Sequence, residues 1–353
     1  MGRTLKAVAL RAERTCLRLT TSFLRRRHLV LAVLSTAILV VLVASPSLLG
    51  ERVGDAIEGL GEARPAWLWT AAGCFVAMHV FTAIAWSTAL RTCGTPTDHG
   101  DAVARYGVGS ALNAIAPAHL GSAVRLVLFA RVVGREGAIW TVGGASAAVG
   151  AIRSFWFSLL VAGAAIGGIV PVWPLALLGL VLLVAGVAVV VSPRLRFRAR
   201  LAHVLDAFAA LGRCPRTIAR IGVLTLGSLA AKVAGAAAVA TSLGIDRPLL
   251  AALVIVPAVE LAAAMPITPG NAGVASAAVA VALATQGVPA TVALGAGIAF
   301  GAVEVLAAVG LGAAGALTLA GPAVRPAIRV AALGAGSAVL ATAFAATVVL
   351  PLA

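Results

Sequence analysis

Charged residues are scarce in this sequence. Of its 353 residues only 11% are Asp, Glu, Lys or Arg, whereas 61% are hydrophobic and the mean hydropathy is +1.06. Soluble domains usually carry about 25% charged residues, so this chain has more apolar surface than a single soluble core can hide. A soluble domain is therefore excluded, and the composition predicts a polytopic membrane protein.

Acidic residues are scarcer than basic ones, with 12 Asp and Glu against 27 Lys and Arg. The basic residues gather before the first apolar run and in one long central loop: Arg3, Lys6, Arg11, Arg14, Arg18, Arg25, Arg26 and Arg27, then Arg194, Arg196, Arg198, Arg200, Arg213, Arg216 and Arg220. Basic loops fix the orientation of membrane proteins and contact anionic headgroups. We expect a cytoplasmic N-terminus, a plasma-membrane location, contact with lipid headgroups at the cytoplasmic face, and no nucleic-acid partner.

Recognisable catalytic and metal-binding motifs are also missing. Cys16, Cys74, Cys93 and Cys214 are scattered without metal-ligand spacing, and His79 has no partner at metal or triad spacing. No Walker-type phosphate loop is present. We expect no catalytic residue, no metal, no cofactor and no nucleotide-driven step.

Long apolar runs predict seven crossings, because roughly 20 helical residues span a bilayer: near 29–49, 66–90, 138–169, 175–192, 219–243, 289–319 and 328–350. The basic loops fall on one side only if residues 100–136 and 249–287 each enter and leave on the same side. We therefore expect an all-α protein with about seven transmembrane helices plus two re-entrant hairpins. Its parts would be a basic segment (1–28), a transmembrane domain (29–320) and a C-terminal helix (321–353).

One of the most apolar stretches is interrupted by MPITPGNAGVAS, residues 265–276. Non-helical backbone at membrane depth survives only where protein buries it or where it lines a wet cavity. Pro266 and Pro269 stop the incoming helix, while Gly270 and Gly273 allow close approach. The stretch is predicted to be the tip of the second hairpin.

The first hairpin has a matching tip. Residues 115–123 overlay 267–275 without a gap, at an offset of 152 (267 − 115), and Pro and Gly match at the same spacing. Three predicted crossings separate the tips, so the two repeats should have opposite topology. Inverted repeats with paired, Pro/Gly-broken segments mark transport sites at the membrane midplane.

Four ionisable residues fall within apolar segments: Arg153, Lys232, Glu260 and Glu304. Each costs at least about 2.5–3.5 kcal/mol at membrane depth, so such residues are usually paired. We predict the pairs Arg153–Glu304 and Lys232–Glu260, with exchangeable partners. They serve either to hold helices together or to receive a phosphate headgroup. Arg125, on the outgoing arm of the first hairpin, is either an anion site or a topology-determining arginine.

The second tip, P-I-T-P-G-N-A-G-V, resembles the P-x-x-P-G-G-x-G-V signature of the lysylphosphatidylglycerol synthase transmembrane-region family, the flippase-like proteins. The first tip, from Asn113 to Arg125, resembles that family's other block, and Arg153 matches its mid-span arginine. The similarity covers about residues 30 to 320. This chain departs from the family at Ser276, where an acid is usual, and at Gly301, where an arginine is common.

The resemblance implies an integral membrane protein that moves, or helps make, modified lipids. The chain ends at Ala353, directly after its last apolar run, so we expect neither the family's soluble aminoacyltransferase domain nor lipid lysylation. This favours a protein that is not an enzyme.

The first hypothesis is translocation of an anionic or modified (glyco)phospholipid. The residues expected to bind or move the lipid are Asn113, Pro117, His119, Gly121, Arg125, Arg153, Lys232, Glu260, Thr268, Pro269, Gly270, Asn271, Gly273 and Glu304. One alternative is a membrane-embedded transferase acting on a lipid-linked substrate, with acids drawn from Glu51, Asp55, Glu58, Asp98 and Asp101. The other is a non-transporting partner subunit of a lipid or glycan synthase. The sequence determines neither the lipid nor the oligomeric state.

Overall fold

The structure is a computed structural model that describes residues 63–95, 97–115, 120–134, 138–169, 208–263 and 272–320. These residues form helices joined by short turns. In chain order they are α3 (Pro65–Thr92), α4 (His99–Ile115), α5 (Leu120–Val133), α6 (Ala138–Ile166), α9 (Pro215–Ser242), α10 (Pro248–Ala263), α11 (Ala272–Ala284) and α12 (Ala290–Leu319). The prediction of an all-α protein is confirmed for the described part of the chain.

Four of these helices, α3, α6, α9 and α12, are long and apolar enough to cross a membrane. At 28 to 30 residues each rises about 42–45 Å, more than the roughly 30 Å hydrocarbon core. They match the crossings predicted near 66–90, 138–169, 219–243 and 289–319. The crossings predicted at 29–49, 175–192 and 328–350 lie outside the described residues.

Two pairs of shorter helices occupy the predicted hairpin segments. α4 and α5 have 17 and 14 residues, and α10 and α11 have 16 and 13. Helices of these lengths rise only about 20–26 Å, less than the hydrocarbon core. Residues 116–119 of the first predicted tip (115–123) and residues 265–271 of the second (265–276) lie outside the described residues, whereas residues 120–123 begin α5 and residues 272–276 begin α11.

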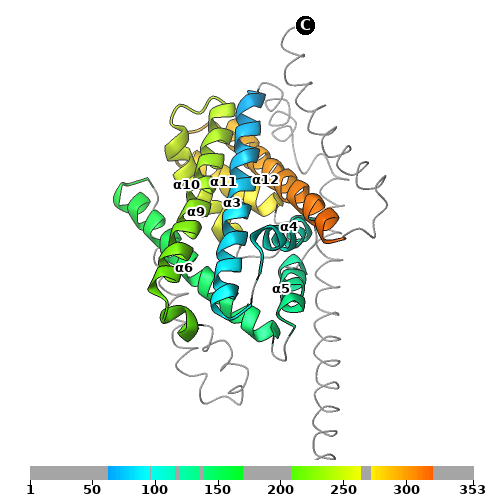
Figure 1. Cartoon of the computed structure of the whole chain (residues 1–353). Coiled ribbons are helices and arrows are strands. Elements are labelled where there is room, and N and C mark those ends of the chain that lie inside the picture. Colours follow the sequence, from blue (N-terminus) through cyan, green and yellow to red (C-terminus); the bar gives the residue numbers. More distant parts are fainter. Residues whose placement is uncertain are drawn as a thin grey trace, which may run out of the picture.

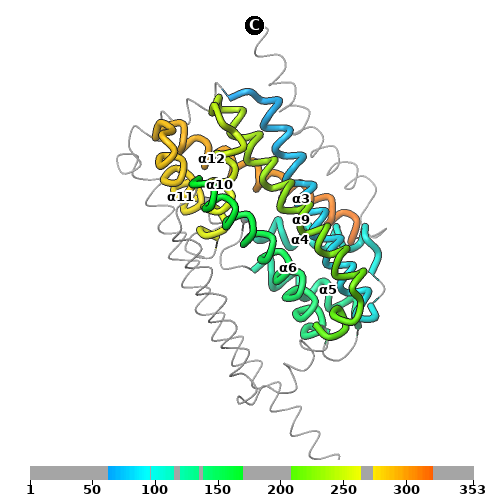
Figure 2. Tube along the Cα trace, turned by 90° about the vertical axis from the view of Figure 1, so that its left-hand side faces the viewer, coloured from blue at the N-terminus to red at the C-terminus, as the bar shows by residue number. Residues whose placement is uncertain are grey.

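The helices α3 and α9 form an antiparallel pair at the centre of the molecule (Figure 1). The N–H of Arg64, before α3, donates to the carbonyl of Ser242, at the end of α9 (2.9 Å). Midway along, the hydroxyls of Thr82 and Ser228 are 2.8 Å apart. In both views α10 and α11 lie toward the end where α3 begins, and α4 and α5 toward the end where it finishes (Figure 2).

The internal repeat seen at the tips extends to whole helices. Leu120 and Ala272, which begin α5 and α11, are 152 positions apart (272 − 120), and so are Ala138 and Ala290, which begin α6 and α12 (290 − 138). Helices α3 to α6 therefore correspond in order to helices α9 to α12. Because the equivalent helices α3 and α9 run antiparallel, the two repeats are inverted relative to one another.

The two repeats are not packed identically. Helix α4 lies closely along α12, where a Cβ on Gly315 would collide with the backbone of Ala104. The equivalent helices α10 and α6 contact each other much less. Among the described residues, no atom lies within 4 Å of the position that a Cβ on Gly163, the counterpart of Gly315, would take. One of two equivalent interfaces is thus tight and the other loose.

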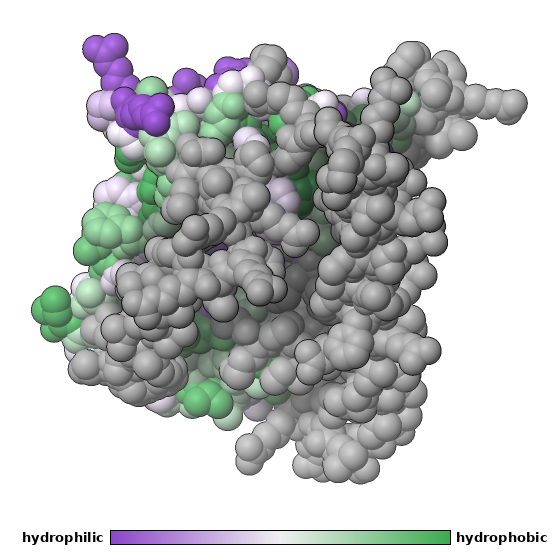
Figure 3. Space-filling model, turned by 90° about the horizontal axis from the view of Figure 1, so that it is seen from below, coloured by the Kyte–Doolittle hydropathy of each residue, from purple (hydrophilic) through white to green (hydrophobic). Residues whose placement is uncertain are grey.

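Apolar side chains form the cores of both halves. Phe75 of α3 packs edge-on against Phe300 of α12, with ring centroids 5.0 Å apart, and Phe129 of α5 is fully buried against α3, α4 and α6. Seen from below, hydrophilic residues gather at one edge of the described surface, and apolar residues cover much of the flank beside them (Figure 3). This distribution is typical of a protein whose flanks face lipid and whose ends face water.

Candidate functional site

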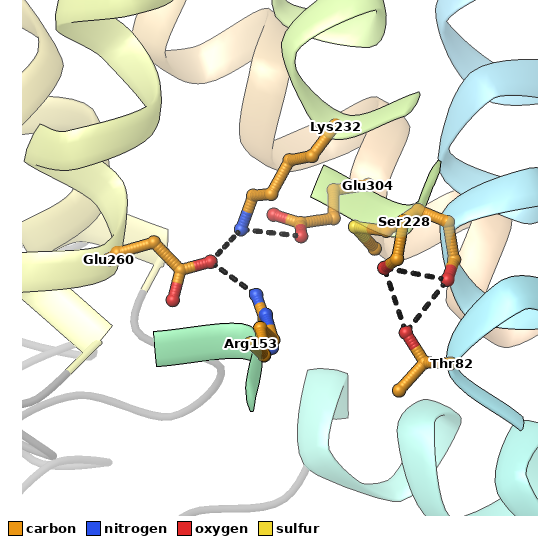
Figure 4. Close-up of polar contacts among 7 residues, drawn as sticks. Thr82, Arg153, Ser228, Lys232, Glu260 and Glu304 are labelled. Carbon is orange, nitrogen blue, oxygen red and sulfur yellow. Dashed lines mark hydrogen bonds and ion pairs between the residues drawn. The ribbon is translucent and has the colours of Figure 1, made fainter. Parts of the chain in front are cut away.

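Four helices each contribute one ionisable side chain to a common interior network (Figure 4). The guanidinium of Arg153 (α6) lies 2.6 Å from Oε1 of Glu260 (α10). Nζ of Lys232 (α9) lies 2.9 Å from the same oxygen and 3.4 Å from Oε1 of Glu304 (α12). We call these four residues the ion-pair network; they join α6, α9, α10 and α12.

The members of the network differ in exposure. The side chain of Lys232 is 7% exposed, so its ammonium group is held between the two carboxylates. The side chain of Arg153 is 35% exposed, although it lies among the helices of the bundle and close to other charged groups. Arg153 therefore has the most exposed side chain of the network.

The structure confirms one predicted pair and corrects the other. Lys232 does bind Glu260, but Arg153 also pairs with Glu260 rather than with Glu304, which binds Lys232 instead. The prediction used the repeat offset, which compares the depth of two residues but not the helix face on which each lies. With two cations and two carboxylates, the network is electrically balanced.

A second polar cluster surrounds Arg125 of α5. Its guanidinium lies over the ring of Tyr106 at 3.9 Å and near Trp86 at 5.7 Å, and one of its terminal nitrogens donates to the hydroxyl of Ser110 (3.1 Å). The ring of His79 on α3 lies 6.1 Å from that of Tyr106. We call these five residues the Arg125 cluster.

Two nitrogens of the Arg125 cluster have no hydrogen-bond partner. Nε of Arg125 and Nε2 of His79 are both buried, and neither bonds to any group of the described residues. No ion pair involves Arg125 within the described ranges either. Buried polar groups are nearly always bonded, so two exceptions around one aromatic ring call for a physical explanation.

Helices α4 and α5 are joined by residues that were predicted from the sequence to belong to the site. The side-chain carbonyl of Asn113 accepts from the N–H of Ser122 (2.9 Å), and its amide donates to the hydroxyl of the same residue (3.0 Å). Gly121 packs directly on the backbone of Gly109 and Asn113, where any Cβ would collide. Asn113 and Gly121 therefore hold α4 against α5 and so position Arg125.

The remaining predicted site residues belong to the tips. Pro117, His119, Thr268, Pro269, Gly270 and Asn271 lie outside the described residues. Gly273 lies in the first turn of α11 and has open space around the position of a Cβ.

Two of the acids considered for a transferase, Asp98 and Asp101, are among the described residues, and they lie at the turn between α3 and α4 and in the first turn of α4. Asp98 accepts a hydrogen bond from the N–H of Gly100 (2.8 Å), which lowers the pKa of its carboxyl. Asp101 pairs with Arg105 one helical turn later (2.9 Å). The acids Glu51, Asp55 and Glu58 lie outside the described residues, and within the described ranges no three His, Cys, Asp or Glu side chains are placed to hold a metal ion.

The same turn is tied to α3 through His99. Nδ1 of His99 is 2.6 Å from the hydroxyl of Ser87, and Nε of Arg91 donates to the carbonyl of Thr97 (2.7 Å). Partial burial lowers the pKa of His99, and the neighbouring charges of Arg91 and Arg220 lower it further. These contacts hold the start of the first hairpin arm against the end of α3.

The sequence analysis missed the surroundings of Arg125. Tyr106, Ser110 and Asn113 follow one another at intervals of four and three residues (110 − 106, 113 − 110), so they share one face of α4. That spacing was a readable signal of a polar helix face. Trp86 lies on a different helix, and only the tertiary packing brings it to Arg125.

Comparison with known proteins adds one finding. The family model described as the lysylphosphatidylglycerol synthase TM region matches residues 28–312, which include helices α3 to α11 and most of α12. No curated protein and no solved structure gives a significant match.

Proposed function

The chain belongs to the lysylphosphatidylglycerol synthase transmembrane-region family, and from that premise we propose that it translocates an anionic or modified (glyco)phospholipid across the plasma membrane. Membership makes it a membrane protein with a lipid-related function. Beyond family membership, the proposal specifies that the reaction is translocation, that the lipid is an anionic or modified (glyco)phospholipid and that the membrane is the plasma membrane. It also keeps the N-terminus cytoplasmic, because the basic segments before residue 28 and in the central loop then face the cytoplasm.

The ion-pair network carries this proposal. Three of its charges lie near the middle of long apolar helices, and Glu260 lies near the end of the short apolar helix α10. Charges at membrane depth are costly, and such residues usually line a pathway for polar substrates. A passing headgroup needs polar contacts at the level where lipid offers none. Arg153 is accessible enough to make them, while Lys232 keeps Glu260 neutralised if Arg153 turns to a phosphate.

In this proposal, two hairpins form the route by which a headgroup reaches the depth of the ion-pair network. We place α4 and α5 as one re-entrant hairpin and α10 and α11 as the other, entering from opposite faces. Their short helices lie toward opposite ends of the α3–α9 pair, which supports this placement (Figures 1 and 2). A headgroup would slide between the hairpins while its acyl chains remain in the bilayer.

A scrambling assay tests the proposal. The full chain is purified into liposomes containing headgroup-labelled phosphatidylglycerol, and a membrane-impermeant quencher reports the outer leaflet. We expect rapid loss of the inner-leaflet signal with the unmodified protein and little loss with Pro269→Ala/Gly273→Leu. Gly310→Leu is the matched control, since no atom lies within 4 Å of the Cβ position on Gly310, and it should retain activity.

The alternatives remain outcomes of this assay. If labelled phosphatidylglycerol, aminoacylated lipids and polyprenyl-phosphate lipids all stay in the inner leaflet, translocation is refuted. The transferase and the partner-subunit hypotheses then take its place, and genes adjacent to this one would separate them.

A further inference from the structure

Arg125 is a half-buried cation that pairs with no carboxylate of the described residues. The ion-pair network uses two cations and two carboxylates, and no described carboxylate pairs with Arg125. Within the described interior the polar groups therefore carry one excess positive charge. Charges at membrane depth are normally paired, so the excess charge indicates that a ligand supplies the counter-charge.

The guanidinium of Arg125 is held ready for such a ligand. Tyr106 covers one face of its plane at 3.9 Å, and Gly109 leaves room for the side chain, because a Cβ there would lie 2.9 Å from Nε. Stacking on an aromatic ring occupies the face of a guanidinium and leaves its in-plane N–H groups free to donate. One terminal nitrogen already bonds Ser110, and the buried Nε has no partner in the described part of the chain.

His79 adds a second, independent group beside Tyr106. Its ring is 6.1 Å from that of Tyr106, and its buried Nε2 also has no partner among the described residues. His79 lies in α3 and Arg125 in α5, so two separate elements each place a side chain with an unsatisfied nitrogen near the ring of Tyr106. A single hydrogen-bonding anion between them would satisfy both nitrogens.

We infer that the phosphodiester of a lipid headgroup binds between Arg125 and His79, and not at the ion-pair network. This rests on the proposed function only in taking the ligand to be a lipid. A phosphodiester carries one negative charge and so balances the one excess positive charge. A phosphomonoester, with nearly two charges above its second pKa of about 6, would leave the interior negative.

The second repeat has no site equivalent to the Arg125 cluster. The positions 152 residues after His79, Tyr106 and Arg125 are Ala231, Ala258 and Ala277 (79 + 152, 106 + 152, 125 + 152). The second repeat instead carries three members of the ion-pair network, Lys232, Glu260 and Glu304. The phosphate is therefore bound in the first repeat, and the two repeats have divided the polar functions between them.

Direct binding tests the site without requiring transport. The full chain in detergent at pH 8 is titrated with dioctanoyl phosphatidylglycerol, and the dissociation constant is taken from the rise in Tm and from tryptophan fluorescence. We expect Arg125→Gln to weaken binding at least tenfold, since a charge-assisted hydrogen bond contributes about that much. The dissociation constant of Arg125→Lys should lie between those of the unmodified protein and Arg125→Gln. His79→Ala should weaken binding roughly threefold or more.

Arg131→Gln is the matched control, because Arg131 lies on the same helix and is exposed. It should bind as the unmodified protein does. Should Arg125→Gln fail to fold, Arg125→Lys and His79→Ala decide the question alone. An unchanged dissociation constant in the folded Arg125 and His79 variants would overturn the site.

Titration with three further ligands distinguishes a lipid phosphodiester from a lipid without phosphate, a lipid phosphomonoester and free phosphate. Dioctanoylglycerol lacks the phosphate and should bind at least tenfold more weakly. Tighter binding of dioctanoyl phosphatidic acid would overturn the preference for a single charge, and equally tight binding of inorganic phosphate would overturn the assignment to a lipid. If the protein binds lipid through Arg125 but scrambles no lipid, translocation is refuted and the binding site stands. If the protein scrambles lipid but its lipid binding does not depend on Arg125, the binding site is refuted and translocation stands.

Discussion

Lys232 is the residue on which the interior charge balance depends. Its ammonium group contacts one carboxylate at 2.9 Å and another at 3.4 Å, and its side chain is only 7% exposed. No other described side chain makes ion pairs with both acids. Removal of one partner from a buried ion pair is far more destabilising than replacement of the whole group, because a charge is left uncompensated.

Lys232→Met should therefore lower the free energy of unfolding by about 3–5 kcal/mol. In Lys232→Met/Glu304→Gln the remaining charges, Arg153 and Glu260, balance again at 2.6 Å, so the double variant should recover part of the loss. Unfolding in mixed detergent micelles measures both. A double variant no more stable than the single one would show that charge balance does not govern this site.

The sequence alone predicts which residues form the interior polar sites better than it predicts which of them contact each other. Charged residues in apolar runs are conspicuous, so Arg153, Lys232, Glu260 and Glu304 were identified without a structure. Their partners were only partly predictable, because depth along a helix says nothing about the face on which a side chain lies. The role of Arg125 depended on Tyr106 and Trp86, which tertiary packing brings to it.

The helices themselves follow signals that are local in sequence. Pro65, Pro215 and Pro248 each begin a helix, where the missing N–H carries no cost, and apolar length distinguishes spans from hairpin arms. The described helices consequently match the predicted segments closely. The close approach of α4 and α5 was not predictable, because glycines are spread throughout this sequence and about half of the described ones have nothing within 4 Å of the Cβ position.

Gly121 distinguishes a packing glycine from the others. Gly121→Ala should reduce the free energy of unfolding by about 1–3 kcal/mol, as overpacking usually does, because its Cβ would collide with Gly109 and Asn113. Gly150→Ala, in α6 with no atom within 4 Å, should be neutral or stabilising by up to about 1 kcal/mol. Paired unfolding curves of the two variants measure the difference, and equal curves would contradict the tight hairpin.

At the scale of the molecule, the two repeats share an order of helices but not a packing arrangement. The interface of α4 with α12 is tight, while that of α10 with α6 is loose around Gly163. A translocase must open its site to each leaflet in turn, and inverted repeats achieve this when the two equivalent interfaces exchange arrangements. For the proposed translocation, we therefore predict that the described arrangement is one of two states.

A cysteine pair detects the second state. In a background without the native cysteines, Gly163→Cys/Val256→Cys places thiols at positions equivalent to Gly315 and Ala104. A disulfide needs Cβ atoms about 3.5–4.5 Å apart, and nothing lies within 4 Å of the Cβ position on Gly163. We expect cross-linking to be slow without lipid and faster with phosphatidylglycerol. Failure to cross-link in both conditions would mean that this interface does not tighten.

The antiparallel contact of α3 with α9 also bears on the origin of the protein. Two copies of one four-helix unit, inserted in opposite orientations, would meet through their first helices in this way, as a dual-topology homodimer does. Fusion of a duplicated gene would free each copy from serving both orientations. It would allow one repeat to carry the Arg125 cluster and the other to carry Lys232, Glu260 and Glu304, as the two repeats do here, which a symmetric dimer could not do.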